Sequence, residues 1–209
     1  NLEKQFKIEK KNYEFVDSNK DGGDVTETID INTSKTIGYF FGASTYSHHS
    51  GCVPSSLEEI TILEGCKNLA TRCFYDIDVK KVNLPNSLNS VGEYCFTRCF
   101  DLKELIIPQN VNNLGKGCFY DCHLTSLSLP FVGQTVSQNR TLAYLYDNSV
   151  SSYLEEVILL DGCTSIAPSA FKNCKYIETV VLGNTITEIG ESAFAGCTAL
   201  SSIKFGSGL

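Results

Sequence analysis

The sequence predicts an α/β solenoid, a right-handed superhelix of 22–23-residue coils that each combine a short parallel β-strand with a short helical or irregular return. One observation is that similar blocks recur along the chain, and their first apolar residues are Leu57, Val79, Leu102, Leu124, Leu154, Ile177 and Leu200. A second is a phenylalanine at one fixed offset in most blocks, present as Phe74, Phe96, Phe119, Phe171 and Phe194. Self-similarity at a period of roughly 20–50 residues is typical of proteins in which each unit packs only on its neighbours. We therefore expect about seven coils, the first and last of them incomplete.

The block that begins at Leu102 shows how one coil is built. Its pattern L-K-E-L-I-I-P places Leu102, Leu105 and Ile107 on the inner side of a short strand. Pro108 ends the strand, because proline has no N–H to donate to a ladder. A turn at Gly115 follows, and a short helical return is expected to point its Cys and Phe side chains inward. Stacking such coils about 4.8 Å apart buries a continuous apolar core.

Two insertions, at about residues 36–56 and 131–153, lengthen particular coils. Each contains a Tyr-rich hexapeptide, 36–41 in the first and 141–146 in the second, followed by a Ser-rich loop and a Leu-Glu-Glu sequence. The coils that follow share a Gly-Cys pair at the same offset, Gly65-Cys66 and Gly162-Cys163. The insertions are thus expected to project loops or a helical turn from one edge of the solenoid.

The solenoid is expected to cover residues 36–209. Residues 1–35 fit the repeat poorly, so we expect an irregular N-terminal segment or a degenerate first repeat there. The chain begins with Asn, contains no Met and stops in mid-repeat without a polar cap. These features predict a fragment of a longer protein, since a solenoid with an open apolar end needs capping.

The charge balance disfavours two classes of partner. Lys plus Arg number 17 and Asp plus Glu 24, for a formal net charge of −7. Nucleic-acid binding and attachment to anionic membranes both need clustered positive charge, so neither is expected. No apolar run approaches the roughly 20 residues of a spanning helix, so we expect no membrane insertion by this chain.

The repeated pattern L-x-x-L-x-I-P-x-x-V-x-x-L-G-x-x-C-F-x-x-C resembles the BspA-like, Treponema-type leucine-rich repeat over about residues 36–209. Members of that family are mostly surface or secreted proteins that act in adhesion and in binding host proteins or other cells. The resemblance implies a non-catalytic binding or adhesion module, extracellular or at the cell surface, whose partner is a protein or cell-surface ligand. The alternatives are a structural spacer that carries another domain, and a metal-binding or redox protein that uses the cysteine cluster. The sequence differs from the family in having Cys73, Cys95 and Cys118, where a small Ala-like residue is more usual.

The ten cysteines fall largely into columns. Cys99, Cys122, Cys174 and Cys197 lie three residues after the repeat Phe, and Cys73, Cys95 and Cys118 lie one residue before it. A ladder of buried free thiols is the favoured interpretation, because a free cysteine packs as a small hydrophobe. Disulfides between stacked columns and a zinc site at Cys95, Cys99, Cys118 and Cys122 stay open as alternatives. Cys52 lies outside the columns and is expected to be exposed, and ten unpaired cysteines would also suit a reducing cytoplasm.

No residue pattern supports catalysis. His48-His49 lies in a Ser-rich loop, and His123 follows a core cysteine at an expected exposed corner. No Ser, Cys or His is placed like a nucleophile with its base, and no Gly-rich phosphate loop follows a strand. We therefore expect no enzyme activity, cofactor or metal. Residues 17–28 open like a calcium-binding loop, but Thr28 stands where such loops need Glu, so a turn-rich loop is favoured.

Two surfaces are candidates for binding. The first is the outward side of the strands, because solenoids display side chains there in rows on a rigid support. Its residues are Glu59, Thr61, Lys81, Asn83, Glu104, Ile106, Ser126, Ser128, Glu156, Ile158, Thr179 and Val181. The second is formed by aromatic residues of the insertions, Tyr39, Phe41, Tyr46, Tyr144, Tyr146 and Tyr153.

Overall fold

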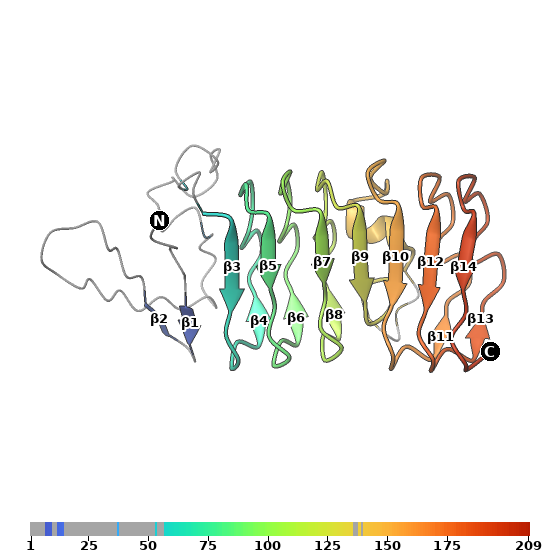
Figure 1. Ribbon diagram of the computed structural model, residues 1–209, viewed down its shortest axis with the longest axis horizontal. Coiled ribbons are helices and arrows are strands. Elements are labelled where there is room, and N and C mark those ends of the chain that lie inside the picture. Colours follow the sequence, from blue (N-terminus) through green and yellow to red (C-terminus); the bar gives the residue numbers. More distant parts are fainter. Residues whose placement is uncertain are drawn as a thin grey trace, which may run out of the picture.

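The structure, a computed structural model, describes residues 57–135, 138 and 140–209, together with residues 37 and 53 and the backbone of residues 7–9 and 12–14. The continuous part forms an elongated β-solenoid of about six turns, so the predicted stacking of short coils is confirmed (Figure 1). One strand per coil builds the main row: β3 (Glu59–Ile62), β5 (Lys81–Asn83), β7 (Glu104–Ile106), β9 (Ser126–Leu129), β10 (Glu156–Leu159), β12 (Thr179–Leu182) and β14 (Ser202–Lys204). At one end of this row, β1 (Lys7–Glu9) pairs in parallel with β3 and antiparallel with β2 (Asn12–Glu14).

The paired strands of the main row are parallel and in register, in two sheets of which one ends at β5 and the other begins at β7. Val157 of β10 pairs with Leu127 of β9 on one side and with Val180 of β12 on the other. All three side chains are buried, as are Leu102 and Ile107 in the coil before them. The inward positions predicted from the repeat are therefore confirmed, and like residues stack on like residues along the core.

A second row of two-residue strands lines another side of the solenoid. It consists of β4 (Asn68–Leu69), β6 (Ser90–Val91) and β8 (Asn113–Leu114), followed after a break by β11 (Ser165–Ile166) and β13 (Glu188–Ile189). The break coincides with the coil that carries the second insertion, in which Leu114 N donates to the Gln134 carbonyl instead of to a regular strand. The insertion thus interrupts the second row while the main row continues past it.

The expected helical return is wrong for these coils. Within residues 57–135 and 140–209 the one helical element is a 3₁₀ helix, η1 (Leu142–Tyr146), which belongs to the insertion. Elsewhere the return is a pair of turns centred on the repeat phenylalanine. The residues two before and two after that phenylalanine all have positive φ: Arg72 and Asp76, Tyr94 and Arg98, Gly117 and Asp121, Ser169 and Asn173, Ser192 and Gly196. A right-handed helix needs negative φ throughout, so two left-handed residues four positions apart prevent it.

The repeat phenylalanines form a stacked column inside the solenoid. Ring centroids are 4.9 Å apart between Phe74 and Phe96, and 6.0 Å apart between Phe96 and Phe119. The next ring in the column is Tyr146 of η1, 5.8 Å from Phe119. Phe119 N also donates to the Leu145 carbonyl, as Phe96 N donates to the Cys118 carbonyl in the regular coils. The Leu-Tyr pair of the insertion therefore replaces the usual Cys-Phe pair, and the column continues.

The longer repeat between the two insertions is confirmed where the structure describes both copies. Ile37 N donates to the Cys73 carbonyl at 2.8 Å, and Leu142 N donates to the equivalent Ala170 carbonyl at 2.7 Å. The two Gly-Cys pairs also match, because each glycine N–H donates to a hydroxyl that itself donates to the carbonyl of the following cysteine. That hydroxyl belongs to Ser87 in the first copy and to Thr185 in the second.

Glycine allows close approach of neighbouring coils directly after the second-row strands. A Cβ on Gly115 would lie 2.3 Å from Glu93 N, and a Cβ on Gly190 would lie 2.4 Å from Pro168 N. Alanine holds this position at Ala167, directly after β11, which is the first strand of its two-stranded row. In the described part of the chain, glycine thus follows each second-row strand that packs on a preceding strand of the same row.

We expect Gly115→Ala to lower the free energy of unfolding by about 1–3 kcal/mol, because the added methyl group meets backbone atoms that cannot swing aside. Urea denaturation followed by far-UV circular dichroism measures the change. Ala167→Gly is the reciprocal control, with an expected cost below about 1 kcal/mol from backbone entropy alone. Equal destabilisation by the two substitutions would contradict a role for close coil approach at Gly115.

Candidate binding surfaces

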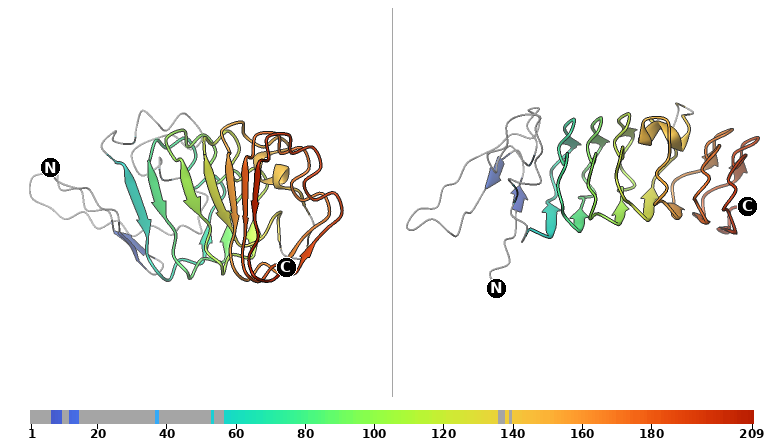
Figure 2. Two further views of the ribbon diagram at one scale, coloured as in Figure 1. Left: turned by 45° about the vertical axis from the view of Figure 1, so that its right-hand side comes forward. Right: turned by 90° about the horizontal axis from the view of Figure 1, so that it is seen from above.

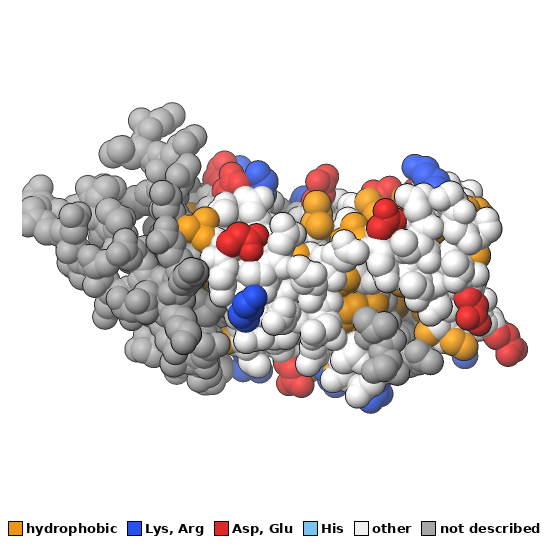
Figure 3. Space-filling view, turned by 90° about the horizontal axis from the view of Figure 1, so that it is seen from below, with side chains coloured by type: hydrophobic (Ala, Val, Ile, Leu, Met, Phe, Trp, Pro, Cys, Tyr) orange, Lys and Arg blue, Asp and Glu red, His pale blue; other side chains and the backbone are white. Residues whose placement is uncertain are grey.

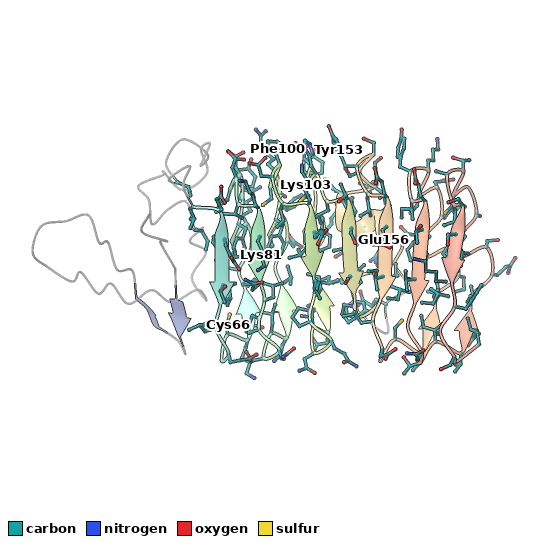
Figure 4. The ribbon with its side chains drawn as sticks, in the orientation of Figure 1. Cys66, Lys81, Phe100, Lys103, Tyr153 and Glu156 are labelled. Carbon is teal, nitrogen blue, oxygen red and sulfur yellow. The ribbon has the colours of Figure 1, made fainter. Side chains whose placement is uncertain are left out.

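The outward side chains of the main row form a flat surface, here called the strand face. Glu59 pairs in register with Lys81, and Glu104, Ser126, Glu156 and Thr179 continue that line across β7 to β12. Thr61 and Asn83 begin a second line that continues through Ile106, Ser128, Ile158 and Val181. Lys81 and Glu156 mark the face in Figure 4, where both lie on the strands themselves. All twelve predicted residues therefore lie in two adjacent lines.

The part of the strand face over β3 and β5 is a closed polar network. Lys81 Nζ lies 2.8 Å from Glu59 Oε1, and Asn83 Nδ2 donates to both Glu59 Oε1 and Thr61 Oγ1. Hydrogen bonds from Lys81 and Asn83 lower the pKa of the exposed Glu59 carboxyl. Because these groups already satisfy one another, a ligand would have to break existing bonds to use them.

Over β7 to β12 one of the two lines of the strand face is largely apolar instead. Ile106 is 64% exposed, and Ile158 and Val181 are half-buried in the same line. Ser128 was expected to be exposed, but it is buried, because this small residue lies in register between the larger Ile106 and Ile158. Ile106, Ile158 and Val181, with the buried Ser128 between the first two, are here called the apolar strip. Beside it, Ser126 Oγ donates to Glu156 Oε2 at 3.0 Å.

The predicted aromatic surface of the insertions is only partly present. Tyr39, Phe41 and Tyr46 lie outside the described residues. Tyr146 is a core residue rather than a surface residue, because it fills the place of the missing phenylalanine in the column. Tyr144 is half-buried beneath the Arg140 guanidinium, which lies 5.5 Å from its ring centroid, whereas Tyr153 is 49% exposed.

Tyr153 belongs to a stack of rings along one edge of the solenoid, here called the aromatic edge. The His123 ring lies 4.0 Å from Tyr153 and 4.7 Å from Phe100, measured between centroids. Figure 4 shows Phe100 and Tyr153 at this edge, where the returns lead back to the main row. His123 was expected at an exposed corner but is half-buried between the two rings.

Sequence analysis missed the aromatic edge as a group. Phe100 directly follows Cys99 and His123 directly follows Cys122, so both occupy one repeat position. Because they share this offset, their rings lie side by side once the coils stack. The shared offset is the sequence signal that could have revealed this pair. The contribution of Tyr153 depends on the path of the insertion, which the repeat does not determine.

The cysteine columns point into the core. Cys66, Cys73, Cys95, Cys99, Cys118, Cys122, Cys163 and Cys174 are buried and Cys197 is half-buried, and the eight of these other than Cys66 are free thiols. Three thiols donate to backbone carbonyls across the stack: Cys99 to Phe74 O, Cys122 to Cys99 O, and Cys197 to Phe171 O. A thiol at this position therefore satisfies a carbonyl that an alanine would leave without that donor.

Burial has a strong effect on these thiols. It raises the pKa of Cys122 and that of Cys174 to about 12, and it also raises the pKa values of Cys95, Cys99 and Cys118 well above the ordinary value of a thiol. Such groups stay protonated and unreactive near neutral pH. Among the described residues, no three His, Cys, Asp or Glu side chains are placed to hold a metal ion. Cys52, His48-His49 and the 17–28 loop lie outside the described part.

Figure 3 views the molecule from the side opposite to the right panel of Figure 2, and most of the described surface there is white, the colour of the backbone and of side chains that are neither hydrophobic nor charged. Charged side chains are scattered over it, and the hydrophobic ones form small groups rather than one large patch. The right panel of Figure 2 places the main row along one side and the returns, with η1, along the other. In the described residues, no helix has the length and apolar character needed to cross a bilayer.

Comparison with known proteins gives one family. The sequence profile described as "BspA type Leucine rich repeat region" matches residues 49–143 and 143–209, with 6 copies. No curated protein matches the sequence.

Several solved structures are similar to this chain. The sequence is 28% identical to a leucine rich cell surface protein of Faecalibacterium prausnitzii, with a TM-score of 0.40 over 77% of this chain and 43% of that one. It is 25% identical to a leucine-rich repeat protein of Bacteroides ovatus, with a TM-score of 0.45 over 76% of this chain and 45% of that one. A leucine rich repeat protein of T. pallidum is 19% identical, with a TM-score of 0.44 over 69% and 78% of the two chains. The chain thus spans less than half the length of the first two.

Proposed function

Since the chain belongs to the BspA-type leucine-rich-repeat family, we propose that it is a non-catalytic binding module that recognises a protein ligand through its strand face. The observation that carries the proposal is the apolar strip. Exposed Ile106 lies in line with Ile158 and Val181 across consecutive strands of a rigid sheet. Protein interfaces have a dry apolar centre surrounded by polar groups, and the strip has this composition.

The surroundings of the strip support the same proposal. Glu104 and Glu156 border it in the adjacent line, and Ser126 holds Glu156 by a hydrogen bond. A polar rim of this kind adds orientation and selectivity at an interface, while the apolar centre supplies most of the affinity.

The proposed setting follows from the family. We place the chain at the cell surface or outside the cell, as part of a longer protein of which it forms a repeat region. The free, protonated thiols suit an anaerobic or reducing setting, in which cysteines stay unpaired. The second candidate function is a spacer that positions another domain, and the closed polar network over β3 and β5 favours it for that part of the face.

Binding to a panel of purified extracellular-matrix and serum proteins, measured by biolayer interferometry, tests the proposal. A ligand found in this way should lose at least about tenfold in affinity on Ile106→Glu, because a charge would then lie at the dry centre of the interface. Leu209→Glu is the control, since Leu209 is also exposed but lies off the strand face. Equal affinity of the two variants, or no ligand in the panel, would favour the spacer.

A further inference from the structure

Two adjoining hollows lie beside the aromatic edge, where the second insertion passes over the returns of the neighbouring coils. Their volumes are about 340 and 550 Å³, and they share Ser149, Val150 and Tyr176 as walls. The smaller hollow is lined by the rings of Tyr120, Tyr153 and Tyr176 and by a row of serines. This concave region is separate from the strand face and takes no part in the proposed protein interface.

The rings around the smaller hollow are exposed and held in place. Tyr153 is 49% exposed, Tyr176 52% and Tyr120 45%. Tyr153 is stacked on His123, which in turn is packed against Phe100. Tyr120 lies edge-on to Tyr94 at 6.3 Å between centroids. Rings that are fixed on one side and open on the other offer flat apolar surfaces at low entropic cost.

The loop that closes the hollow is also anchored. Tyr94 Oη donates to Asp147 at 3.2 Å, and Lys116 Nζ forms an ion pair with the same carboxylate at 2.7 Å. Hydrogen bonding and the charge of Lys116 lower the pKa of Asp147, so the pair is ionised at neutral pH. The serines that follow Asp147 along the chain, at 149, 151 and 152, are thereby placed around the rings.

A buried hydroxyl group lies beneath the smaller hollow. Tyr146 contributes to the wall of that hollow, and its side chain as a whole is only 2% exposed. Its Oη is buried with no hydrogen-bond partner among the described residues. This oxygen is closed to solvent, so a ligand in the hollow would contact the exposed rings and the serines instead.

The lining excludes several ligand classes. An apolar small molecule needs deep apolar walls, whereas these hollows are open and lined by roughly equal polar and apolar groups. A polyanion needs clustered positive charge, whereas the described lining carries Lys172 and Lys175 in one hollow and Asp121 in the other. A sugar ring combines an apolar face of C–H bonds with a rim of hydroxyls, which matches exposed rings bordered by serine, asparagine and carboxylate groups.

We propose that these hollows bind an oligosaccharide, with one sugar ring against Tyr153 and the next residues of the glycan extending past Tyr176. The serine hydroxyls then donate hydrogen bonds to sugar hydroxyls or accept them, and the Asp121 carboxylate accepts them. Lys172 and Lys175 lie in the larger hollow, where they favour a glycan that carries a carboxylate or N-acetyl group at that end.

The test is isothermal titration calorimetry of the full chain with cellotetraose, maltotetraose, chitotetraose, mannotetraose and sialyllactose. We expect at least one of them to bind with a Kd between about 10 μM and 1 mM. Tyr153→Ala and Tyr176→Ala should each weaken that binding at least about tenfold with little change in melting temperature. Tyr146→Phe should leave both sugar binding and the stability of the free protein nearly unchanged, because it removes a buried, unpartnered hydroxyl that the ligand does not reach.

Two controls separate this site from the strand face. Phe205→Ala removes an exposed ring elsewhere and should leave sugar binding unchanged, as should Ile106→Glu on the apolar strip. No detectable binding by any of the sugars at 10 mM, or equal affinity in the Tyr153→Ala variant, would overturn the proposal. Binding of a proline-rich peptide instead of the sugars, weakened by Tyr153→Ala, would assign the rings to a peptide ligand and would likewise overturn it.

Discussion

Raising the pH from 8 to 10 in the presence of a reductant is expected to lower the free energy of unfolding by several kcal/mol. Burial raises the pKa values of at least five core thiols above the ordinary value, to about 12 for Cys122 and Cys174. Above pH 9 the unfolded chain releases these protons while the folded chain keeps them. The free energy of unfolding is therefore at its full value below about pH 9. Between pH 9 and 12 it falls by about 1.4 kcal/mol per pH unit for each buried thiol.

The matched control for this prediction comes from the repeat itself. Ala170 and Ala193 occupy the position that Cys95 and Cys118 hold in other coils, so the double variant Cys95→Ala/Cys118→Ala should still fold. Its unfolding free energy should fall less steeply with pH, by about 2.7 kcal/mol per unit for the two thiols removed. Urea denaturation at half-unit steps of pH measures both slopes. Parallel slopes for the two proteins would mean that other groups cause the alkaline loss.

Phe119→Ala is expected to cost about 3–5 kcal/mol of folding free energy. Phe119 is fully buried and packs between Phe96 on one side and Tyr146 on the other, so its removal leaves a cavity at the centre of the column. In a chain of this size the melting temperature should fall by roughly 10 °C. Hydrogen exchange should show the largest loss of protection in the coils on either side of the cavity, since each coil contacts only its neighbours.

Phe205→Ala provides the comparison, because the ring of Phe205 is 60% exposed. Its expected cost is within about 0.5 kcal/mol. Similar melting temperatures for the two variants would contradict the expected cost of a cavity in the phenylalanine column.

The repeat allowed the buried side of the fold to be predicted well. Leu102, Leu105, Ile107 and Phe119 were placed inward from spacing alone, and all are buried. This works because stacking at a fixed period forces equivalent residues into equivalent places. The same argument placed Ser128 on the surface, where the size of its two neighbours overrides the alternation.

The return and the insertion were harder to predict. Left-handed residues at the two positions that flank each repeat phenylalanine are mostly not glycine, as Tyr94 and Arg98 show, so no local sequence signal marked the turns. Tyr146 was counted as a surface aromatic because the register across the 30-residue coil cannot be read from spacing. The pairing of Phe100 with His123 followed from the repeat, but neither residue type by itself indicated a site.

The position of Tyr146 in the phenylalanine column has a consequence for how such a chain can change over time. The insertion keeps its neighbours in phase by contacts on both sides. The Tyr146 ring packs on Phe119 and the Leu145 carbonyl accepts from Phe119 N, while Leu142 N donates to the Ala170 carbonyl of the following coil. Other residues of the insertion, such as Asn148, Ser149 and Ser152, are exposed and lie outside the core. Selection can change such exposed positions without altering the stack, provided that Leu142, Leu145 and Tyr146 keep their buried places. Ligand recognition and fold stability thus depend on different residues of one coil, so binding specificity can change while the solenoid stays the same.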